Sequence, residues 1–421
     1  MQGVEDALAA AFANIELDQG VVVAFSGGID STVLLHACHH YALTSGHTIK
    51  ALYVDHQLQK HSSDWQRHCQ KFCAALEINY DSVQVDTRAF ADNGPEGSAR
   101  EARYQAFSEY LHAGEVLLTA HHADDQVETL FLRLLRGAGN KGLVGCVAQR
   151  QLGSGQLLRP LLGVSQQTIL CYAEGHHLEW CDDPSNQSLQ MDRNYLRHEV
   201  MPKLYQRWPQ LRATVLRASQ WQAESTQLLE RLAEQDCGGC SDNPLPIEVL
   251  PKQHAASLKN ALRWWIQQQG FKPPSASVLQ QITEHLLPAP EDAMACVKWS
   301  QVEMRKYRDQ LYVFPALSEH CVSQQLAWDL NDPLHLPSVG VTLTHNELHK
   351  AGLSLQGVEQ LHIRFRQGGE SLRPRGRGCE KSLKALFQEQ GVPPWLRDRI
   401  PLLYHHDQLI FVLGYWIHEG Y

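Results

Sequence analysis

Residues 21–35 read VVVAFSGGIDSTVLL, and this stretch decides the fold. Residues 21–25 are mostly β-branched or aromatic, which is typical of a buried parallel strand. From Ser31 the chain continues as the apolar-rich start of a helix. Gly27 and Gly28 stand at the turn, where the absence of Cβ atoms lets a ligand approach the backbone. Because a helix N-terminus offers unpaired N–H groups and a positive dipole end, we predict a phosphate site here.

Asp30 indicates that the phosphate ligand carries a divalent cation. A bare carboxylate repels phosphate unless a divalent cation bridges them, so the expected ligands are ATP and Mg²⁺. For Ser-Gly-Gly alone, an ordinary strand-to-helix turn with a serine cap is the simpler explanation. The stretch fits neither G-x-x-x-x-G-K-[ST] nor G-x-G-x-x-G. The complete S-G-G-x-D-S after an apolar strand resembles the signature of the PP-loop ATP-pyrophosphatases, which cleave ATP between its α- and β-phosphates.

Length and composition indicate a globular protein of more than one domain. The chain has 421 residues, of which 43% are hydrophobic and 20% charged, and its net charge is −9. Such a length predicts two or three domains. No stretch approaches the roughly 20 apolar residues of a membrane span, and we expect no membrane partner. The 11 cysteines form no disulfide framework and the N-terminus resembles no signal peptide, so we expect a cytoplasmic protein.

Strand-like and helix-like segments alternate in the first half. The expected strands are 21–25, 49–55, 78–83 and 116–120. The expected helices are 31–44, 63–76, 98–111, 123–135 and 165–175. Such alternation predicts an α/β fold with a parallel sheet covered on both faces, whose site lies beyond the carboxyl ends of the strands. Ser26, Asp55 with His56, and His121 with His122 follow strand ends and are therefore expected to share one crevice.

The pattern changes beyond residue 202. We expect a connector helix over 210–235, a mostly helical module, hairpin-like alternation over 296–314, and a loop-like linker at 329–337. A small α+β unit should follow, with a terminal strand at 409–413. The expected domains are a PP-loop catalytic domain (1–215), a connector with a mostly helical domain (216–338) and a C-terminal α+β domain (339–421).

Carboxylates follow the fourth expected strand, in HHADDQVE at 121–128. Asp125 and Glu128 are three residues apart and lie on one face of the expected helix. Acidic residues also suit a first helical turn, which explains this segment taken alone. A metal site at its two histidines is not favoured, because adjacent side chains diverge. With Asp30 and Asp55 in the same crevice, however, the clustered carboxylates predict Mg²⁺ binding or proton abstraction.

Two arginine pairs have helical spacing. GSAREARY contains Arg100 and Arg103, and DRNYLR contains Arg193 and Arg197. Arginine can hold phosphate bidentately and neutralise the charge of a leaving group. A solvated basic face is an equally good explanation of the first pair. The second pair is positioned to face an RNA backbone or base.

The C-terminal stretch 362–399 is basic within an acidic chain. It carries nine arginines and lysines against four acidic residues. A solvated charged face remains open, but so local an excess favours a polyanionic partner.

These segments, in this order, resemble the bacterial tRNA(Ile)-lysidine synthetase family. The matching elements are S-G-G-x-D-S, D-H, A-R-x-x-R-Y, H-H-x-x-D-Q-x-E-T, R-G, R-P-L-L, D-P-S-N and R-N-x-x-R. The tail elements R-P, K-A-L-F, P-P-W and I-P-L-L resemble the third domain of its longer members. The likeness is densest over 21–200, while 216–340 matches only in general character.

The resemblance implies a ligase acting on the isoleucine tRNA that bears a CAU anticodon. The 2-carbonyl oxygen of the wobble cytidine would attack the α-phosphate of ATP and release pyrophosphate. The ε-amine of free L-lysine would then displace AMP and form lysidine. Pairing would change from G to A, and charging from methionine to isoleucine.

The resemblance also suggests residue roles. The expected catalytic residues are Asp30, Asp125, Glu128 and Arg103. The expected ATP-binding residues are Ser26, Gly27, Gly28, Ile29, Asp30, Ser31, Asp55 and His56. The expected tRNA-binding residues are Arg100, Arg193, Arg197, Arg373, Arg377, Lys384 and Arg397. Asp30 is an expected metal ligand, Asp125 is the expected base or second metal contact, and Glu128 would hold an ammonium group of lysine.

Alternative functions remain to be weighed. A tRNA cytidine thiolase of the same superfamily would need cysteines for a cluster or persulfide. The single C-x-x-C, Cys237 to Cys240, ends the connector helix outside the crevice and is not favoured as a cluster site. A non-catalytic RNA-binding protein and a small-molecule amidoligase are less favoured, given the carboxylates and the basic tail. The sequence leaves open whether the chain forms a homodimer.

Overall fold

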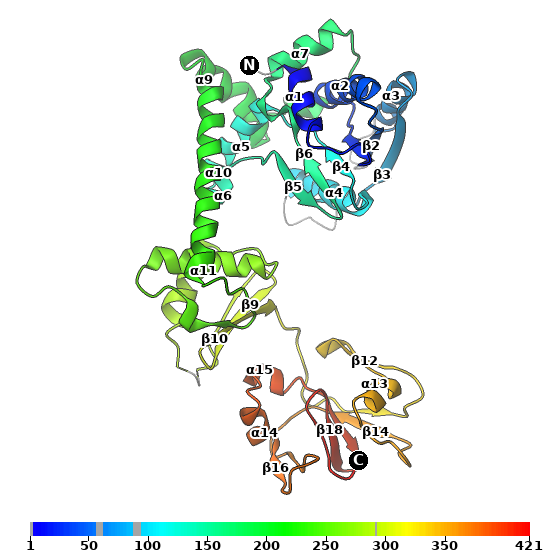
Figure 1. Ribbon diagram of the computed structural model, residues 1–421, viewed down its shortest axis with the longest axis vertical. Coiled ribbons are helices and arrows are strands. Elements are labelled where there is room, and N and C mark those ends of the chain that lie inside the picture. The colour runs from blue at the N-terminus through cyan, green and yellow to red at the C-terminus, as the bar shows by residue number, and fades with distance from the viewer. Residues whose placement is uncertain (1–2, 56–61, 87–93, 291–292) are drawn as a thin grey trace. The chain divides into compact units, whose positions relative to one another are not determined.

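The computed structural model describes residues 3–55, 62–86, 94–290 and 293–421 (Figure 1). The chain divides into two compact units, Met1–Leu228 and Leu229–Tyr421. The three domains expected from the sequence stay a prediction. In the described ranges, no helix is both long enough and apolar enough to cross a membrane.

The first unit contains a six-stranded sheet in the order β3-β2-β1-β4-β6-β5. Its strands are β1 (Val21–Ala24), β2 (Ile49–Asp55), β3 (Asn79–Gln84), β4 (Val116–Leu118), β5 (Gln149–Leu152) and β6 (Gly155–Leu158). All neighbours are parallel except the edge strand β5, which pairs antiparallel with β6. The predicted parallel α/β sheet is confirmed. The β5–β6 hairpin was not predicted, because Gln149–Leu152 is mostly polar and exposed and lacks an apolar strand signal.

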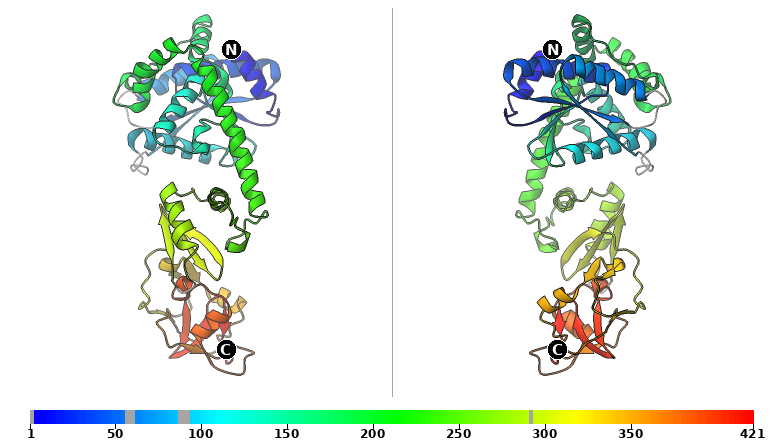
Figure 2. Two further views of the ribbon diagram at one scale, coloured as in Figure 1. Left: turned by 90° about the vertical axis from the view of Figure 1, so that its left-hand side faces the viewer. Right: turned by 90° about the vertical axis from the view of Figure 1, so that its right-hand side faces the viewer.

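Helices cover both faces of this sheet (Figure 2). The helices α1 (Val4–Phe12), α2 (Ile29–Ser45), α3 (Ser62–Ala75) and α7 (Gln166–Gly175) pack on one face, and α4 (Gly94–Tyr110) packs on the other. The chain as far as Asp236 also forms α5 (Ala123–Leu135), α6 (Asn140–Leu143), α8 (Asp192–Tyr195), α9 (Met201–Arg207) and α10 (Leu211–Asp236). A π-helical turn, Leu196–Val200, joins α8 to α9. The predicted connector helix corresponds to α10.

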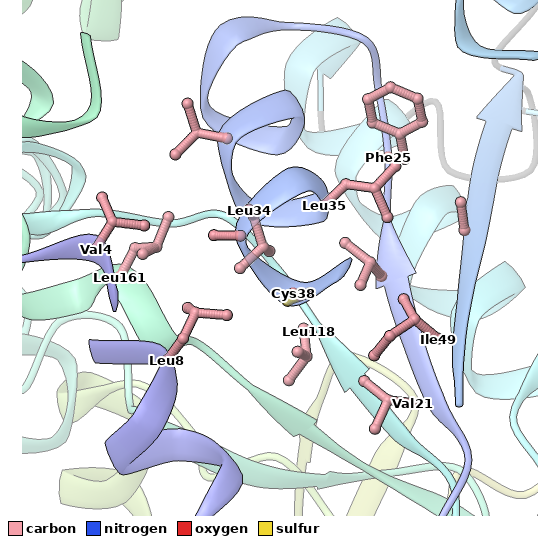
Figure 3. Packing of buried hydrophobic residues seen from close by; sticks show 14 of the residues in the cluster. Val4, Leu8, Val21, Phe25, Leu34, Leu35, Cys38, Ile49, Leu118 and Leu161 are labelled. Atoms are coloured by element: carbon pink, nitrogen blue, oxygen red, sulfur yellow. The ribbon is translucent and has the colours of Figure 1, made fainter. Parts of the chain in front are cut away.

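Alternate strand residues build two cores. Val21 and Val23 of β1 belong to the larger core with α1, α2, α3 and α7, while Val22 belongs to a second core with Phe107 of α4. Figure 3 shows the larger core, in which Leu34 of α2 gathers with residues of α1 and of the strands. Burial on both faces explains why β1 is apolar at every position. Because β1 is buried on both faces, the start of the turn that follows it is held in place.

The second unit begins with a helical and antiparallel module. The helices α11 (Ala255–Gln268) and α12 (Ala276–Gln281) pack against a sheet in the order β7-β10-β9-β8. Its strands are β7 (Leu245–Pro246), β8 (Cys296–Trp299), β9 (Val302–Tyr307) and β10 (Gln310–Pro315). The hairpin-like stretch 296–314 is therefore a three-stranded meander rather than a single hairpin.

A five-stranded antiparallel sheet, β11-β14-β17-β18-β19, organises the C-terminal part of the second unit. Its strands are β11 (Leu326–Trp328), β14 (Leu361–Arg364), β17 (Leu402–His405), β18 (Gln408–Val412) and β19 (Trp416–Ile417). Around it lie β12 (Leu334–Leu336), β13 (Val341–Leu343), β15 (Ser371–Leu372), β16 (Lys381–Ser382), α13 (His345–Lys350), α14 (Leu383–Glu389) and α15 (Pro394–Arg397). The predicted α+β character is confirmed.

The expectation of a loop-like linker at 329–337 is wrong in its second half. Leu334–Leu336 forms β12, which pairs with β13, and Leu336 is buried in the core of the C-terminal part. A three-residue Leu-His-Leu alternation is too short to stand out beside the turn-forming residues that precede it.

Candidate active site

The turn after β1 has a backbone shape that requires glycine. Gly27 has a φ of +81°, and a Cβ atom there would lie 2.9 Å from the Sγ of Cys69. The Oγ of Ser31 accepts from the Ser26 amide at 3.2 Å and donates to the Gly28 carbonyl at 2.9 Å. These contacts hold the turn in one conformation against the sheet.

The helix after the turn begins without a side-chain cap. Gly28 is the N-cap residue of the 17-residue helix α2 and makes no side-chain capping bond. Thr32 Oγ1 donates back to the Gly28 carbonyl at 3.0 Å. An uncapped N-terminus behind a tight glycine turn suits an anionic ligand. The geometry of Ser26, Gly27, Gly28 and Ser31 therefore fits the predicted phosphate cradle.

Two arginines contact two carboxylates near this turn. Arg193 donates to Asp125 Oδ1 at 2.7 Å and to Glu128 Oε2 at 2.9 Å. Arg197 donates to Glu128 Oε1 at 2.6 Å and to Asp125 Oδ1 at 3.3 Å. With Asp30, three carboxylates face two guanidiniums, so the ionised cluster keeps one negative charge. Asp30, the pair Asp125 and Glu128, and the pair Arg193 and Arg197 are far apart in the sequence and thus form one site.

Asp125 is held ionised. Burial would raise its pKa, but His122, Arg193 and His121 outweigh burial and lower the pKa to about 2. A carboxylate with so low a pKa is a weak proton acceptor. Asp125 therefore suits the binding of a cation better than the removal of a proton.

Asp30 lacks a compensating cation. Burial raises the pKa of Asp30, His122 lowers it in part, and Asp125 raises it further. Its Oδ1 is buried and receives no hydrogen bond from the described part of the chain. Mg²⁺ is commonly bound by one or two carboxylates together with substrate phosphates. Asp30 beside the phosphate cradle fits that pattern, and within the described ranges no three-residue His/Cys/Asp/Glu cage competes with it.

Arg100 of α4 and His121 lie near each other beside the site. Arg100 and Arg103 are exposed on α4, and the Arg100 guanidinium lies 5.2 Å from the ring centre of Tyr104. Burial lowers the pKa of His121 to about 3; the charge of Asp125 opposes this, and those of Arg159 and Arg100 add to it. His121 is therefore a neutral imidazole that experiences both Asp125 and Arg100.

The structure describes two of the three remaining predicted ATP-binding residues and gives their positions in the fold. Asp55 is buried at the end of β2, beside β1, as expected. Ile29 is the first residue of α2. His56 lies outside the described residues.

Asp124 has a different set of hydrogen-bond partners from its neighbour Asp125, and the sequence did not predict this difference. Asp124 Oδ1 accepts from Arg212 at 2.6 and 2.9 Å and from the Tyr205 hydroxyl at 2.9 Å. Its Oδ2 accepts from the Gln166 amide at 2.9 Å. Asp124 therefore anchors α9, α10 and the start of α7 to α5. Adjacent aspartates carry no sequence signal that separates this anchor from Asp125.

Two of the four predicted tRNA-binding residues of the tail form ion pairs at the surface. Arg373 lies 2.7 Å from Glu419, and Arg377 lies 2.6 Å from Glu389. Lys384 is exposed on α14. Arg397, in contrast, is buried and donates to the Val392 carbonyl at 2.9 Å and to the Tyr307 hydroxyl at 3.1 Å. We therefore leave Arg397 out of the tRNA surface, since its guanidinium is used inside the protein.

Comparisons with known proteins identify the family of this chain. A model of the PP-loop domain matches residues 2–204, one of the TilS substrate binding domain matches 245–312, and one of the TilS substrate C-terminal domain matches 361–421. The tRNA(Ile)-lysidine synthase of Coxiella burnetii is 40% identical over 401 residues, which cover 95% of this chain and 89% of that protein. The tRNA(Ile)-lysidine synthase of Serratia proteamaculans is 40% identical over 405 residues, covering 95% and 92% of the two chains. The chain therefore belongs to the tRNA(Ile)-lysidine synthase family.

Proposed function

We propose that this chain ligates L-lysine to the 2-position of the wobble cytidine in the isoleucine tRNA with a CAU anticodon. ATP is consumed through an adenylated base, and AMP and pyrophosphate are released. The observation that carries the proposal is a phosphate cradle beside a buried carboxylate–arginine cluster, in a chain that matches lysidine synthases over nearly its whole length.

The phosphate cradle would serve the first step. Backbone groups of residues 26–31 would hold the leaving pyrophosphate, while exposed Arg100 and Arg103 would neutralise charge that develops on the phosphates. Asp30 would hold Mg²⁺, which when bound supplies charge neutralisation to the phosphates. The cytidine must leave the anticodon stack to reach this point, which costs less in a loop than in a duplex.

The carboxylate cluster would serve the second step. A lysine side chain has a reference pKa of about 10.4 and arrives as an ammonium ion. Asp125 and Glu128 are largely buried carboxylates whose oxygens can accept hydrogen bonds from such a cation. We assign Asp125 and Glu128 to holding lysine, since the low pKa of Asp125 disfavours it as the base. Arg193 and Arg197 would hold both carboxylates in place and contact the nucleotide.

The exposed basic residues of the second unit would bind the tRNA outside the anticodon. Arg373, Arg377 and Lys384 are the residues we assign to this surface. Surface ion pairs such as Arg373 with Glu419 are weak, so a phosphate can replace the carboxylate at little cost.

The thiolase alternative is not favoured. Cys237 is buried at the end of α10, and no cysteine-containing metal cluster occurs in the described ranges. Cys69 contacts the phosphate turn at Gly27, but burial raises the pKa of its thiol, which suits packing rather than sulfur transfer.

A reconstituted reaction tests the proposal. The purified chain is incubated with ATP, Mg²⁺, radiolabelled lysine and an unmodified tRNA transcript. We expect lysine incorporation and pyrophosphate release only when all components are present, and loss of incorporation in Asp125→Ala. Undiminished turnover of Asp125→Ala would remove this residue from the mechanism. Sedimentation velocity of the same sample tests whether the chain is a homodimer.

A further inference from the structure

His122 is a buried residue at the start of α5 with a determined tautomer. It is the N-cap residue of the helix, and only 1% of its surface is exposed. Its Nδ1 accepts a hydrogen bond from the backbone amide of Asp124 at 3.2 Å. Because an accepting nitrogen carries no hydrogen, the ring proton must be on Nε2.

That Nε2–H group lies between two carboxylates of the site. It is 3.8 Å from Asp30 Oδ1 and 3.5 Å from Asp125 Oδ2. Both distances exceed a normal hydrogen bond of about 2.7–3.2 Å, so the N–H group lies between the two carboxylates and acts on both electrostatically, without a hydrogen bond to either. Asp30 belongs to the first turn of α2 and Asp125 to the first turn of α5, so the ring links two separate elements.

Without the Nε2–H group of His122, the close approach of the Asp30 and Asp125 carboxylates would be unfavourable. Two like charges in a buried site repel each other, and Asp30 Oδ1 receives no hydrogen bond from the described part of the chain. Asp125 has its own donors in Arg193 and Arg197, whereas Asp30 has none that reaches its Oδ1. The position of Asp30 relative to Asp125 therefore depends on His122.

We propose that His122 is a positioning residue that sets the position of Asp30, relative to the lysine-holding Asp125, for the divalent cation bound with ATP. The inference rests on the proposed function in assuming that a nucleotide with its cation binds here. Mg²⁺ requires near-ideal octahedral geometry, so the placement of its carboxylate ligand matters. Groups that orient metal ligands typically contribute about 10- to 100-fold in metal affinity.

A simpler role for His122 would be to cap α5 and nothing more. Two substitutions separate these roles. His122→Asn keeps a side-chain oxygen where Nδ1 accepts from Asp124, and asparagine is a favoured N-cap residue, but it removes the distal N–H. His122→Gln places an amide N–H close to the position of Nε2, but glutamine is a poorer cap. The capping role and the positioning role therefore predict opposite rankings of the two variants.

The test uses the full-length chain without tRNA or lysine. Calorimetric titration of ATP at a series of Mg²⁺ concentrations gives the concentration required for half-maximal ATP binding, and urea unfolding gives the stability. We expect His122→Asn to unfold at the urea midpoint of the unmodified chain and to require about 10- to 100-fold more Mg²⁺. We expect His122→Gln to unfold at lower urea and to keep a Mg²⁺ requirement close to that of the unmodified chain. His112→Asn, at an exposed histidine of the same unit, should change neither quantity.

An unchanged Mg²⁺ requirement in His122→Asn would overturn the inference. So would an equal rise in His122→Gln, which remains measurable if the asparagine variant fails to fold. Lysidine formation by the unmodified chain is measured in parallel. Its absence would contradict the proposed function while leaving the Mg²⁺ comparison of the His122 variants intact.

Discussion

Arg193 Nε donates to Glu128 Oε2 at 2.9 Å, although the two residues are 65 positions apart in the chain. Arg197, one helical turn later, donates to both oxygens of the same carboxylate. The turn formed by α8 and Leu196–Val200 therefore packs against the acidic face of α5. Residues that the sequence suggested for separate tasks, lysine binding and nucleotide binding, form one charge network.

The Arg193–Glu128 pair should be strongly coupled because the Glu128 side chain is only 4% exposed. In a double-mutant cycle of Arg193→Gln and Glu128→Gln, we expect a coupling free energy of about 1–3 kcal/mol by urea unfolding. The control is the exposed pair Arg136 and Asp192, with side chains 69% and 75% exposed. Its cycle, Arg136→Gln with Asp192→Asn, should give about 0–1 kcal/mol. Equal couplings would contradict the buried network.

Replacing Gly27 by alanine should lower stability, whereas the same replacement at Gly28 should not. Gly27→Ala introduces a Cβ 2.9 Å from Cys69 Sγ at a φ of +81°. The left-handed conformation alone costs about 1–2 kcal/mol for a residue with a Cβ. We expect lower stability and weaker ATP binding by calorimetry. In Gly28→Ala the new Cβ meets only Ser26 Oγ at 3.7 Å, so stability should be retained. The same loss of stability in both variants would argue against this account of the turn.

Stability should fall in acid because of a histidine cluster on α2 and α7. His36 is buried, its ring centre lies 4.4 Å from that of His40 and 5.0 Å from that of His176, and its Nδ1 lies 3.1 Å from the Tyr172 hydroxyl. Burial, and then the charges of His40, His176 and His39, lower the pKa of His36 to about 4 from an ordinary value of 6.5. The unfolded chain therefore binds this proton more tightly than the folded chain.

The stabilisation from neutral His36 is complete above pH 6.5 and is lost as the pH falls toward 4. We expect a loss of about 3 kcal/mol over this range from urea unfolding. His36→Gln should flatten the pH dependence. His112→Gln, an exposed histidine of the same unit, should leave it unchanged. A steep acid loss that persists in His36→Gln would assign the effect to other groups.

The basic surface of the second unit should contribute to tRNA affinity through salt-dependent contacts. Reversing Arg373 and Arg377 to glutamate should weaken tRNA binding and reduce the slope of log affinity against log salt by about 0.7–0.9 for each lost phosphate contact. ATP binding should be unaffected. Lys71→Glu, an exposed cation of α3, is the matched control and should leave the slope unchanged. Equal affinity of the double variant across salt concentrations would exclude this surface.

The sequence predicts this fold well where periodicity and turn chemistry agree. The bounds of α5 match the prediction residue for residue, because an apolar stripe starts directly after a strand end and stops at Gly137. The edge hairpin of β5 and β6 escaped prediction because its first strand is polar. An apolar pattern in the sequence marks the side chains that a segment buries. An edge strand such as β5 buries few side chains and therefore shows no such pattern.

The site is harder to predict because its roles depend on residues far away in the chain. Asp124 and Asp125 are neighbours in the sequence but have different partners. Arg212 donates to Asp124, whereas Arg193 and Arg197 donate to Asp125. Arg397 belongs to a basic run, but its guanidinium is buried against Tyr307. His122 was set aside because it diverges from its neighbour His121, and this divergence is what directs it between Asp30 and Asp125.

The most direct test of the proposed activity is the mass of the modified nucleoside. Isoleucine tRNA transcript with a CAU anticodon is incubated with the purified chain, ATP, Mg²⁺ and isotopically labelled lysine, then digested and analysed by mass spectrometry. The proposal predicts a cytidine that has gained one labelled lysine with loss of water, together with one AMP and one pyrophosphate for each nucleoside modified. A thiolated cytidine, or an unmodified cytidine with ATP consumed, would contradict it.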